Sequence, residues 1–147
     1  MFTQKTFSPK ASEITKHWYV VDAENQTVGR LASEIAKILK GKNKPEFATH
    51  IDTGDFVVVV NCEKVKFTGN KWDDKIYNWH TNHIGGIKAR TAKEQLEKHP
   101  ELIVYEAVKG MLSKNTLGRK QLTKLKVFKG ATHAHEAQSP IPLTLNK

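Results

Sequence analysis

The triplet Asp52-Thr53-Gly54 is the first group of residues in this sequence whose types could perform catalysis. A dimeric aspartic protease takes such a triplet from each of two subunits, so that two carboxylates share one proton. Two features argue against that chemistry: Thr49 and His50 precede the triplet in place of a strand, and the extra charge of Asp55 would disturb a shared proton. We therefore predict that Asp52 or Asp55 shapes the turn into the next strand through side-chain bonds to the backbone, and the protease is the remote alternative.

Two pairs of histidines could bind a metal ion. His80 and His83 are one pair, and His133 and His135 are the other, with Glu136 next to it. Structural zinc takes four ligands, most often Cys and His in tight pairs, and neither histidine pair has a convincing third ligand. We predict no metal and no other cofactor, and we interpret the histidines as contacts to phosphate or to RNA edges, because cations lie beside them in the sequence.

Motifs of several other function classes are missing from the sequence. No P-loop and no GxGxxG motif follows the first predicted strand, and no serine or cysteine lies in a nucleophile motif, so we expect neither an enzyme nor a small-molecule substrate. No apolar run approaches the 18 or so residues of a membrane span, and the N-terminus lacks the apolar region of a secretory signal. The single Cys62 fits a reducing compartment, where we expect it to be a buried, inert thiol.

The strongest signal is the basic window Val108–Gly130, which holds seven Lys or Arg residues and no acid. Residues 1–106 carry sixteen basic and fourteen acidic side chains, whereas residues 107–147 carry eight and one, so the net charge of +9 is concentrated in the C-terminal quarter. A solvated helix face, the alternative, normally mixes both signs of charge. Cations without acidic partners gain free energy by displacing counterions from a polyphosphate, so we predict a nucleic-acid partner. The seven cations alternate with apolar residues, which predicts that they project outward from the domain.

Two further clusters could contribute to the same kind of surface. The segment KGKNK, residues 40–44, follows the first predicted helix, and an ordinary solvated loop is its alternative interpretation. The segment YNWHTNHIGGIKAR, residues 77–90, places aromatic side chains among cations, a combination that suits structured RNA with unpaired bases. In the alternative interpretation Tyr77 and Trp79 belong to the core, where we expect at least one of them.

The first half of the chain predicts a strand, a helix and a second strand. A β-branched and aromatic run at residues 18–21 indicates a strand. Thr27 is a predicted N-cap, apolar residues recur at helical spacing from Val28 to Leu39, and Gly41 is the expected left-handed C-cap. Residues 55–60, DFVVVV, are apolar on both faces, as in a central strand of a parallel sheet. This βαβ unit predicts an α/β fold, with helices that follow later covering the other face of the sheet.

The remaining elements divide the chain into three predicted parts. We expect an extended N-terminal arm at residues 1–16, an α/β domain at 17–130 and an extended C-terminal tail at 131–147. Within the domain, the sequence predicts strands at residues 64–69 and 74–81, a glycine-hinged loop at 83–90, a helix that Thr91 and Glu94 cap, a helix from Pro100 to Met111 and a third helix at 117–125.

An ordered set of motifs resembles one known family. The segments HWYVVDAENQTVGRLASEIAKILKGK, HIDTGDFVVVVN, FTGNK, HTNHIGGIKAR, AVKGMLSKNTLGRKQLTKLKVFKG and HAHEAQSP are similar to those of the bacterial large-ribosomal-subunit protein of the L-thirteen family, over roughly residues 15–140. The resemblance implies a single three-layer α/β/α domain around a small, mostly parallel sheet, with basic C-terminal helices and extended tails. The candidate RNA-binding residues are Lys40, Lys42, Lys44, Lys71, His80, His83, Lys88, Arg90, Lys109, Lys114, Arg119, Lys120, Lys124, Lys126 and Lys129.

The leading functional hypothesis is a structural constituent of the large ribosomal subunit. The resemblance implies binding to large-subunit ribosomal RNA early in assembly, with no catalytic activity, support of translation, and neighbouring large-subunit proteins as further partners. We therefore expect the protein in the cytoplasm, in the ribosome, and not at a membrane. A free RNA-binding regulator of transcription or messenger RNA is the alternative, because the same cationic surface would serve it.

Overall fold

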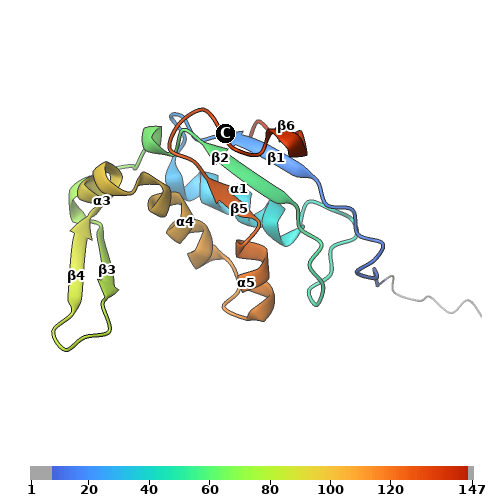
Figure 1. Ribbon diagram of the computed structural model, residues 1–147, viewed down its shortest axis with the longest axis horizontal. Helices are drawn as coiled ribbons and strands as arrows, with labels where there is room; N and C mark the ends of the chain where they lie inside the picture. The colour runs from blue at the N-terminus through green and yellow to red at the C-terminus, as the bar shows by residue number, and fades with distance from the viewer. Residues whose placement is uncertain (1–7, 146–147) are drawn as a thin grey trace, which may run out of the picture.

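A four-stranded parallel sheet forms the centre of the protein in the computed structural model, which describes residues 8–145 (Figure 1). The strands are β1 (Trp18–Asp22), β2 (Phe56–Val60), β5 (Leu125–Val127) and β6 (Ile141–Pro142), in the order β5-β2-β1-β6. All three neighbouring pairs are parallel. The prediction of a mostly parallel sheet with a βαβ start is therefore confirmed.

Two helices pack together on one face of the sheet. Helix α1 (Val28–Lys40) begins after Thr27 and ends at Gly41, which has the left-handed φ of 81° that the sequence predicts. Helix α4 (Pro100–Met111) starts with its proline in the first turn and packs against α1. Their apolar residues join Val57 and Val59 of β2 in one buried core.

The other face of the sheet has no helical layer within residues 8–145. There Phe56 of β2 stacks on Trp18 of β1 with ring centroids 4.3 Å apart, and the His135 ring lies 5.2 Å from Trp18. Val58 is fully buried on this face, because the chain that follows β5 folds over the sheet. The expected second layer of helices is therefore not found. A strand that is apolar on both faces indicates that both faces are covered, but its sequence does not indicate which element covers them.

A β-hairpin projects from the body and is called the arm below (Figure 1). It consists of β3 (Ile76–His80) and β4 (Ile87–Thr91), which pair antiparallel. Helix α2 (Lys71–Asp74) precedes the arm and helix α3 (Ala92–Lys98) follows it. Thr91 and Glu94 form the predicted capping box at the start of α3.

Several predicted boundaries were wrong. The expected strand at residues 64–69 is a 3-10 turn (Cys62–Lys64) followed by one bridge between Lys66 and Thr27. The expected loop at 83–90 is half strand, because residues 87–90 belong to β4. Helix α5 (Thr116–Leu122) ends before the predicted residue 125, where the chain enters β5 and gains a sheet partner that local sequence does not reveal.

The two predicted tails are partly described. Residues 1–7 of the predicted N-terminal extension and residues 146–147 of the predicted C-terminal tail lie outside the described residues. Residues 131–145 contain a 3-10 turn (Glu136–Gln138) and β6, which joins the sheet beside β1. The C-terminal segment is therefore attached to the domain by backbone hydrogen bonds, such as that from the Leu143 N–H to the Val20 carbonyl at 2.8 Å.

Gly54 marks a backbone contact on which the sheet depends. A Cβ at this position would lie 1.8 Å from the Leu39 carbonyl oxygen at the end of α1. Gly54→Ala should therefore lower the free energy of unfolding by about 3 kcal/mol, as overpacking against a fixed backbone does. Urea unfolding followed by circular dichroism measures the change. In Gly110→Ala the new methyl group meets no atom within 4 Å, so this control should be neutral or gain up to about 1 kcal/mol of helix stability. Equal stability of the two variants would contradict the role of Gly54.

Candidate nucleic-acid interface

The turn between α4 and α5 presents exposed cations on a rigid backbone. Asn115 caps α5, and its side-chain oxygen accepts a hydrogen bond from the Gly118 N–H at 2.7 Å. A Cβ on Gly118 would lie 1.8 Å from the Ser113 carbonyl oxygen, so the glycine is needed for this turn to close. The cap therefore fixes the position of the exposed side chains of Lys114, Arg119 and Lys120.

The structure brings the predicted cluster at residues 40–44 next to this turn. The Lys40 ammonium donates a hydrogen bond to the Met111 carbonyl oxygen at 3.1 Å, 71 residues away in sequence. A hollow between the two segments is lined by Lys40, Lys42 and Asn115, among others. Two clusters that are distant in sequence therefore form one surface, called the basic edge below. It consists of Lys40, Lys42, Lys109, Lys114, Arg119 and Lys120.

Most cations of the basic edge have no acidic partner. Within residues 8–145, no ion pair forms at Lys42, Lys114, Arg119 or Lys120. Lys109 is the exception, since its ammonium lies 2.8 Å from a carboxylate oxygen of Glu106, one helical turn earlier. The hydrogen bond to Glu106 raises the pKa of Lys109 above its usual range.

Lys124 corrects the prediction that all seven cations of the basic window project outward. Its side chain is buried, with 3% of the residue exposed, and its ammonium lies 2.5 Å from a carboxylate oxygen of Asp52. The same ammonium donates to the Leu39 carbonyl oxygen at 3.2 Å. Because both partners are internal, the Lys124 ammonium is held in a structural ion pair.

Lys44 has a similar structural role. Its ammonium lies 2.6 Å from a carboxylate oxygen of the fully buried Asp55 and also donates to the Thr15 carbonyl oxygen at 2.9 Å. The same Asp55 oxygen accepts the His17 N–H at 2.9 Å. Asp55 therefore bonds to the backbone, as predicted, but to the segment before β1 and not within the turn that leads into β2. The side-chain bonds of Asp52 go to the ammonium groups of Lys16 and Lys124. Lys44 holds the segment before β1 in place and leaves Lys42 as the exposed cation of this loop.

Asp52 is held between two ammonium groups. Burial opposes its charge, but Lys124 and Lys16, whose ammonium lies 3.1 Å from the second carboxylate oxygen, lower the pKa of Asp52 below its usual range. A carboxylate stabilised in its charged form does not suit the shared proton of an aspartic protease. Thr53 and Gly54 pack against the end of α1, where the Thr53 hydroxyl donates to the Lys40 carbonyl oxygen at 3.3 Å.

One face of the arm carries both aromatic residues and cations. Tyr77 pairs across the arm with Arg90, and Trp79 pairs with Lys88, so these four side chains share a face. The Arg90 guanidinium lies over the Trp79 ring, 4.4 Å from its centroid. A cleft between the arm and helices α3 and α4 is lined by these two residues together with Tyr77. Tyr77 packs against the core, as predicted for at least one of the aromatics, and its burial raises its pKa.

The sequence reasoning missed one cation of the arm. Lys75 is exposed, and its ammonium lies over the Tyr77 ring, 5.1 Å from the centroid. The sequence did contain a signal for this residue: Lys75 lies two positions before Tyr77, and alternate residues of a strand share a face. Lys71, which was predicted, is exposed on α2 and donates to the Thr68 hydroxyl at 3.2 Å.

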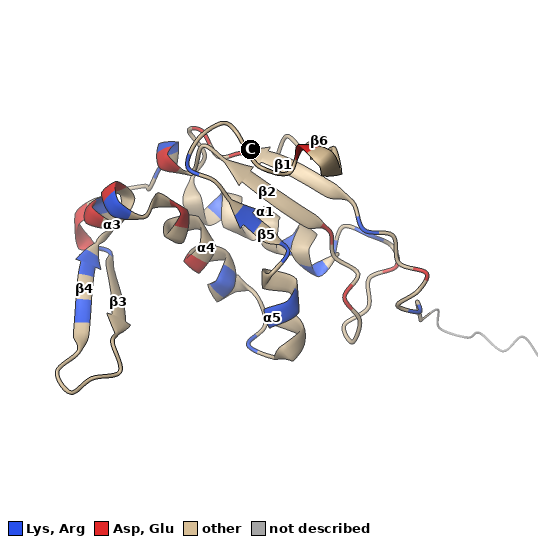
Figure 2. Ribbon diagram, viewed as in Figure 1, with Lys and Arg blue, Asp and Glu red and all other residues tan. Residues whose placement is uncertain are grey.

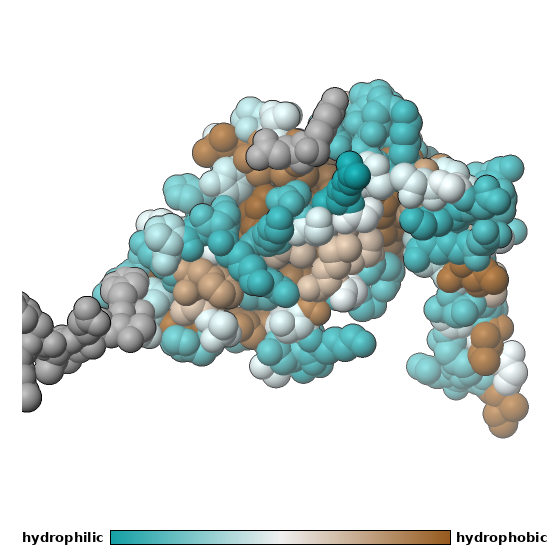
Figure 3. Space-filling view, turned by 180° about the vertical axis from the view of Figure 1, so that it is seen from behind, coloured by the Kyte–Doolittle hydropathy of each residue, from teal (hydrophilic) through white to brown (hydrophobic). Residues whose placement is uncertain are grey.

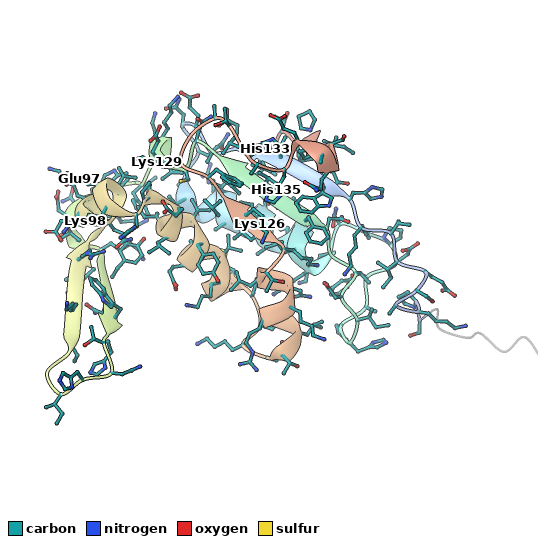
Figure 4. The ribbon with its side chains drawn as sticks, in the orientation of Figure 1. Glu97, Lys98, Lys126, Lys129, His133 and His135 are labelled. Atoms are coloured by element: carbon teal, nitrogen blue, oxygen red, sulfur yellow. The ribbon has the colours of Figure 1, made fainter. Side chains whose placement is uncertain are left out.

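The histidines are divided between two places. His80 lies on the opposite face of the arm from Arg90, and its Nδ1 accepts the Asn82 N–H at 2.9 Å, while His83 is exposed in the arm loop. His133 and His135 lie over the sheet, on the same side as Lys126 (Figure 4). The ring of His135 packs against Trp18 and Phe128. Among residues 8–145, no group of three or more metal-ligating side chains could hold an ion.

The charges are distributed unevenly over the molecule. Acidic and basic side chains are mixed on α2 and α3 at the base of the arm, whereas α5 and the end of α4 are basic (Figure 2). The space-filling view shows a wide hollow between the arm and the body of the protein (Figure 3).

Two other predictions concern the chain as a whole. Cys62 is buried, as predicted, and burial raises the pKa of its thiol to about 12, which keeps it protonated and unreactive. The described helices include none with the length and apolar character that a membrane crossing requires.

Comparison with known proteins identifies relatives over nearly the whole chain. Residues 16–134 match the family described as Ribosomal protein L13. The large ribosomal subunit protein uL13 of Desulfotalea psychrophila is 59% identical over 141 residues, covering 96% of this chain and 99% of the relative. The uL13 proteins of Alkaliphilus oremlandii and of a Synechococcus strain are 57% and 55% identical, covering 96% and 97% of this chain and 99% and 95% of the relatives.

The lowered pKa of Asp52 predicts an acid-labile contribution to stability. A carboxyl whose pKa is lower in the folded than in the unfolded protein stabilises the fold above the unfolded value, near 3.8, and loses that contribution as the pH falls through the folded value. In urea unfolding experiments, the free energy of unfolding should therefore decline from pH 6 to pH 2.5, and the decline should be smaller in Asp52→Asn than in the unmodified protein. Some decline should persist, because a hydrogen bond from Asn61 also lowers the pKa of Asp22. Parallel curves for the two proteins would contradict this assignment.

Proposed function

Because this chain belongs to the ribosomal protein L13 family, we propose that it is a structural constituent of the large ribosomal subunit that binds large-subunit ribosomal RNA through the basic edge and the arm. The family is not enzymatic, so the aspartic protease hypothesis for Asp52-Thr53-Gly54 is wrong. The function is to hold RNA segments in a fixed arrangement, and no substrate is turned over.

The observation that supports this proposal is the basic edge itself. Its exposed cations come from the loop after α1, from α4, from the turn before α5 and from α5. Backbone contacts position this surface, such as the Asn115 cap and the bond from Lys40 to Met111. Unpaired cations on a rigid surface repel one another in the free protein. RNA phosphates relieve that repulsion and release condensed counterions, which supplies the affinity.

The arm adds a second type of contact. Tyr77, Trp79 and Arg90 line a cleft beside Lys88, so an unpaired base that enters the cleft meets aromatic and guanidinium surfaces, while Lys88 reaches the backbone phosphate. Lys71, His83, Lys126 and Lys129 are exposed or half-buried and lie outside the basic edge, where they contact RNA at its periphery. Lys44 and Lys124 are left out of the proposed interface because their ammonium groups are bound internally.

Such a protein supports assembly by joining RNA segments. The basic edge and the arm are separated by the hollow seen in Figure 3, so RNA segments bound to each are held in one relative orientation. This arrangement favours early binding, because it restricts the RNA before later components add, and it supports translation in the cytoplasmic ribosome. Neighbouring large-subunit proteins are the further partners.

The salt dependence of RNA binding tests the basic edge. Replacing Lys114, Arg119 and Lys120 by Gln removes three unpaired cations, so the slope of log affinity against log salt should fall by about three units. Filter binding or anisotropy with a large-subunit ribosomal RNA fragment, between 50 and 300 mM salt (about the usual working range), measures the slope.

A matched control removes the same charge elsewhere. Lys64, Lys93 and Lys98 are exposed away from the basic edge, and Lys64 is paired with Glu24. Replacing these three residues by Gln should leave the slope nearly unchanged, with a small uniform loss from the lower net charge. If both triple variants lowered the slope equally, net charge alone would explain binding and the basic edge would not be the site.

Sedimentation separates the ribosomal constituent from a free regulator. In a sucrose gradient of a cell extract, the protein should migrate almost wholly with the large subunit at low salt. Its release on washing at high salt should occur at lower salt for the Lys114, Arg119 and Lys120 variant. A predominantly free pool at the top of the gradient would favour the regulator of transcription or messenger RNA.

A further inference from the structure

A buried polar side chain lines the cleft between the arm, α3 and α4, which is called the arm cleft below. Gln95 of α3 is only 4% exposed, yet it lines this cleft of about 400 Å³ together with Trp79 and Arg90. Its amide nitrogen donates a hydrogen bond to the His99 carbonyl oxygen at 3.1 Å, and no hydrogen bond to its amide oxygen forms among residues 8–145. Buried polar groups are normally hydrogen-bonded, so this oxygen is left to accept from water or from a ligand in the cleft.

An acidic side chain lines the arm cleft as well. Glu106 of α4 is one of its lining residues, and the Lys109 ammonium donates to both of its carboxylate oxygens, at 2.8 and 3.1 Å. A carboxylate has about four lone-pair positions, so Glu106 keeps the capacity to accept from a second partner. Burial, and then the charge of Glu106, raise the pKa of Tyr77 in the wall of the cleft. The negative charge of Glu106 is therefore felt inside the cleft.

These acceptors decide which part of an RNA suits the arm cleft. A phosphate is negatively charged and has no hydrogen to donate, so the carboxylate of Glu106 repels it. The edge of a base carries N–H donors, and its ring stacks on aromatic or guanidinium surfaces, which Trp79 and Arg90 supply. The arm cleft therefore suits a base, whereas the phosphates suit the cations outside it.

Guanine matches a pair of acceptors better than the other RNA bases do. Its Watson–Crick edge carries two adjacent donors, the N1–H and the N2 amino group. Adenine and cytosine each place one amino donor beside an acceptor, and uracil has one N–H between two carbonyl oxygens. A buried acceptor that meets a base acceptor is left unpaired, which makes such a site selective. Resting on the proposed function, we propose that the arm cleft binds an unpaired guanine of large-subunit ribosomal RNA, with Gln95 and Glu106 accepting hydrogen bonds from its Watson–Crick edge.

Nucleotide titration followed by NMR tests this proposal on the intact protein. Guanosine and inosine monophosphate have the same ribose and phosphate, but inosine lacks the N2 amino group, so a difference between them comes from the base edge. Each nucleotide is added to isotope-labelled protein, and the Trp79 indole N–H and Gln95 side-chain amide signals should shift. Guanosine monophosphate should bind at these signals at least about fivefold more tightly than inosine monophosphate, the lower limit for a pair of base-edge hydrogen bonds. Equal affinities would overturn the choice of guanine.

Two variants with the same change of charge assign the preference to Glu106. Glu106→Gln keeps the size of the side chain and removes its charge. It should reduce the preference for guanosine over inosine monophosphate to less than about twofold, because hydrogen bonds to a charged acceptor are about twice as strong. Glu97→Gln, at an exposed position of α3 that is not among the lining residues, should retain the full preference (Figure 4). An unchanged preference in Glu106→Gln, with circular dichroism showing it folded, would overturn the proposed contact.

The failure of this inference can be told apart from the failure of the proposed function. If neither nucleotide shifted the Trp79 and Gln95 signals while the large-subunit RNA fragment still bound with its full salt slope, the guanine site would be overturned and the basic edge would stand as the RNA site. If the RNA fragment itself did not bind, the proposed function would fail, and the guanine site with it.

Discussion

The buried ion pair between Lys124 and Asp52 is the interaction on which the arrangement of the basic half of the protein depends. Lys124 precedes β5, and its ammonium reaches both the carboxylate before β2 and the Leu39 carbonyl at the end of α1. Because a buried ammonium is costly without partners, the chain at this point can adopt few other positions. Helix α5 and strand β5, which flank Lys124, are thereby fixed relative to α1, and the basic edge becomes one surface.

The lysines of this protein consequently have two roles that their residue type does not distinguish. Lys44 and Lys124 neutralise the buried Asp55 and the half-buried Asp52, and their removal would leave Asp55 without its ion-pair partner and Asp52 with Lys16 alone. Lys114 and Lys120 have no such partner within the described part of the chain and are exposed. Part of the excess positive charge of the C-terminal quarter is therefore neutralised by an ion pair inside the fold. Only the remaining cations are available to a polyanion.

The arm and the basic edge meet a partner in different ways. In the proposed function, the basic edge offers charge to an RNA on a backbone that the Asn115 cap and the bond from Lys40 to Met111 hold in place. The arm combines the stacking surface of Trp79 and Arg90 on one face with exposed isoleucines on the other. A hairpin suits this division, because alternate residues of a strand point to opposite faces. One thin element therefore carries two chemically different surfaces.

The sequence by itself determined the βαβ start, the ends of α1 and α3, and the excess of positive charge on which the proposed RNA partner rests. Each of these follows from local signals: apolar periodicity, Gly41 at a helix end, the Thr91 and Glu94 cap, and the absence of acids from residues 107–135. Only the tertiary structure decided that Lys124 is buried and that β5, and not further helix, follows α5. It also decided that the chain after β5 covers the face of the sheet opposite α1 and α4. These features depend on partners far away in sequence, such as Asp52 for Lys124 and Val57 for Leu125, and no local pattern encodes which distant residue a side chain or strand will meet.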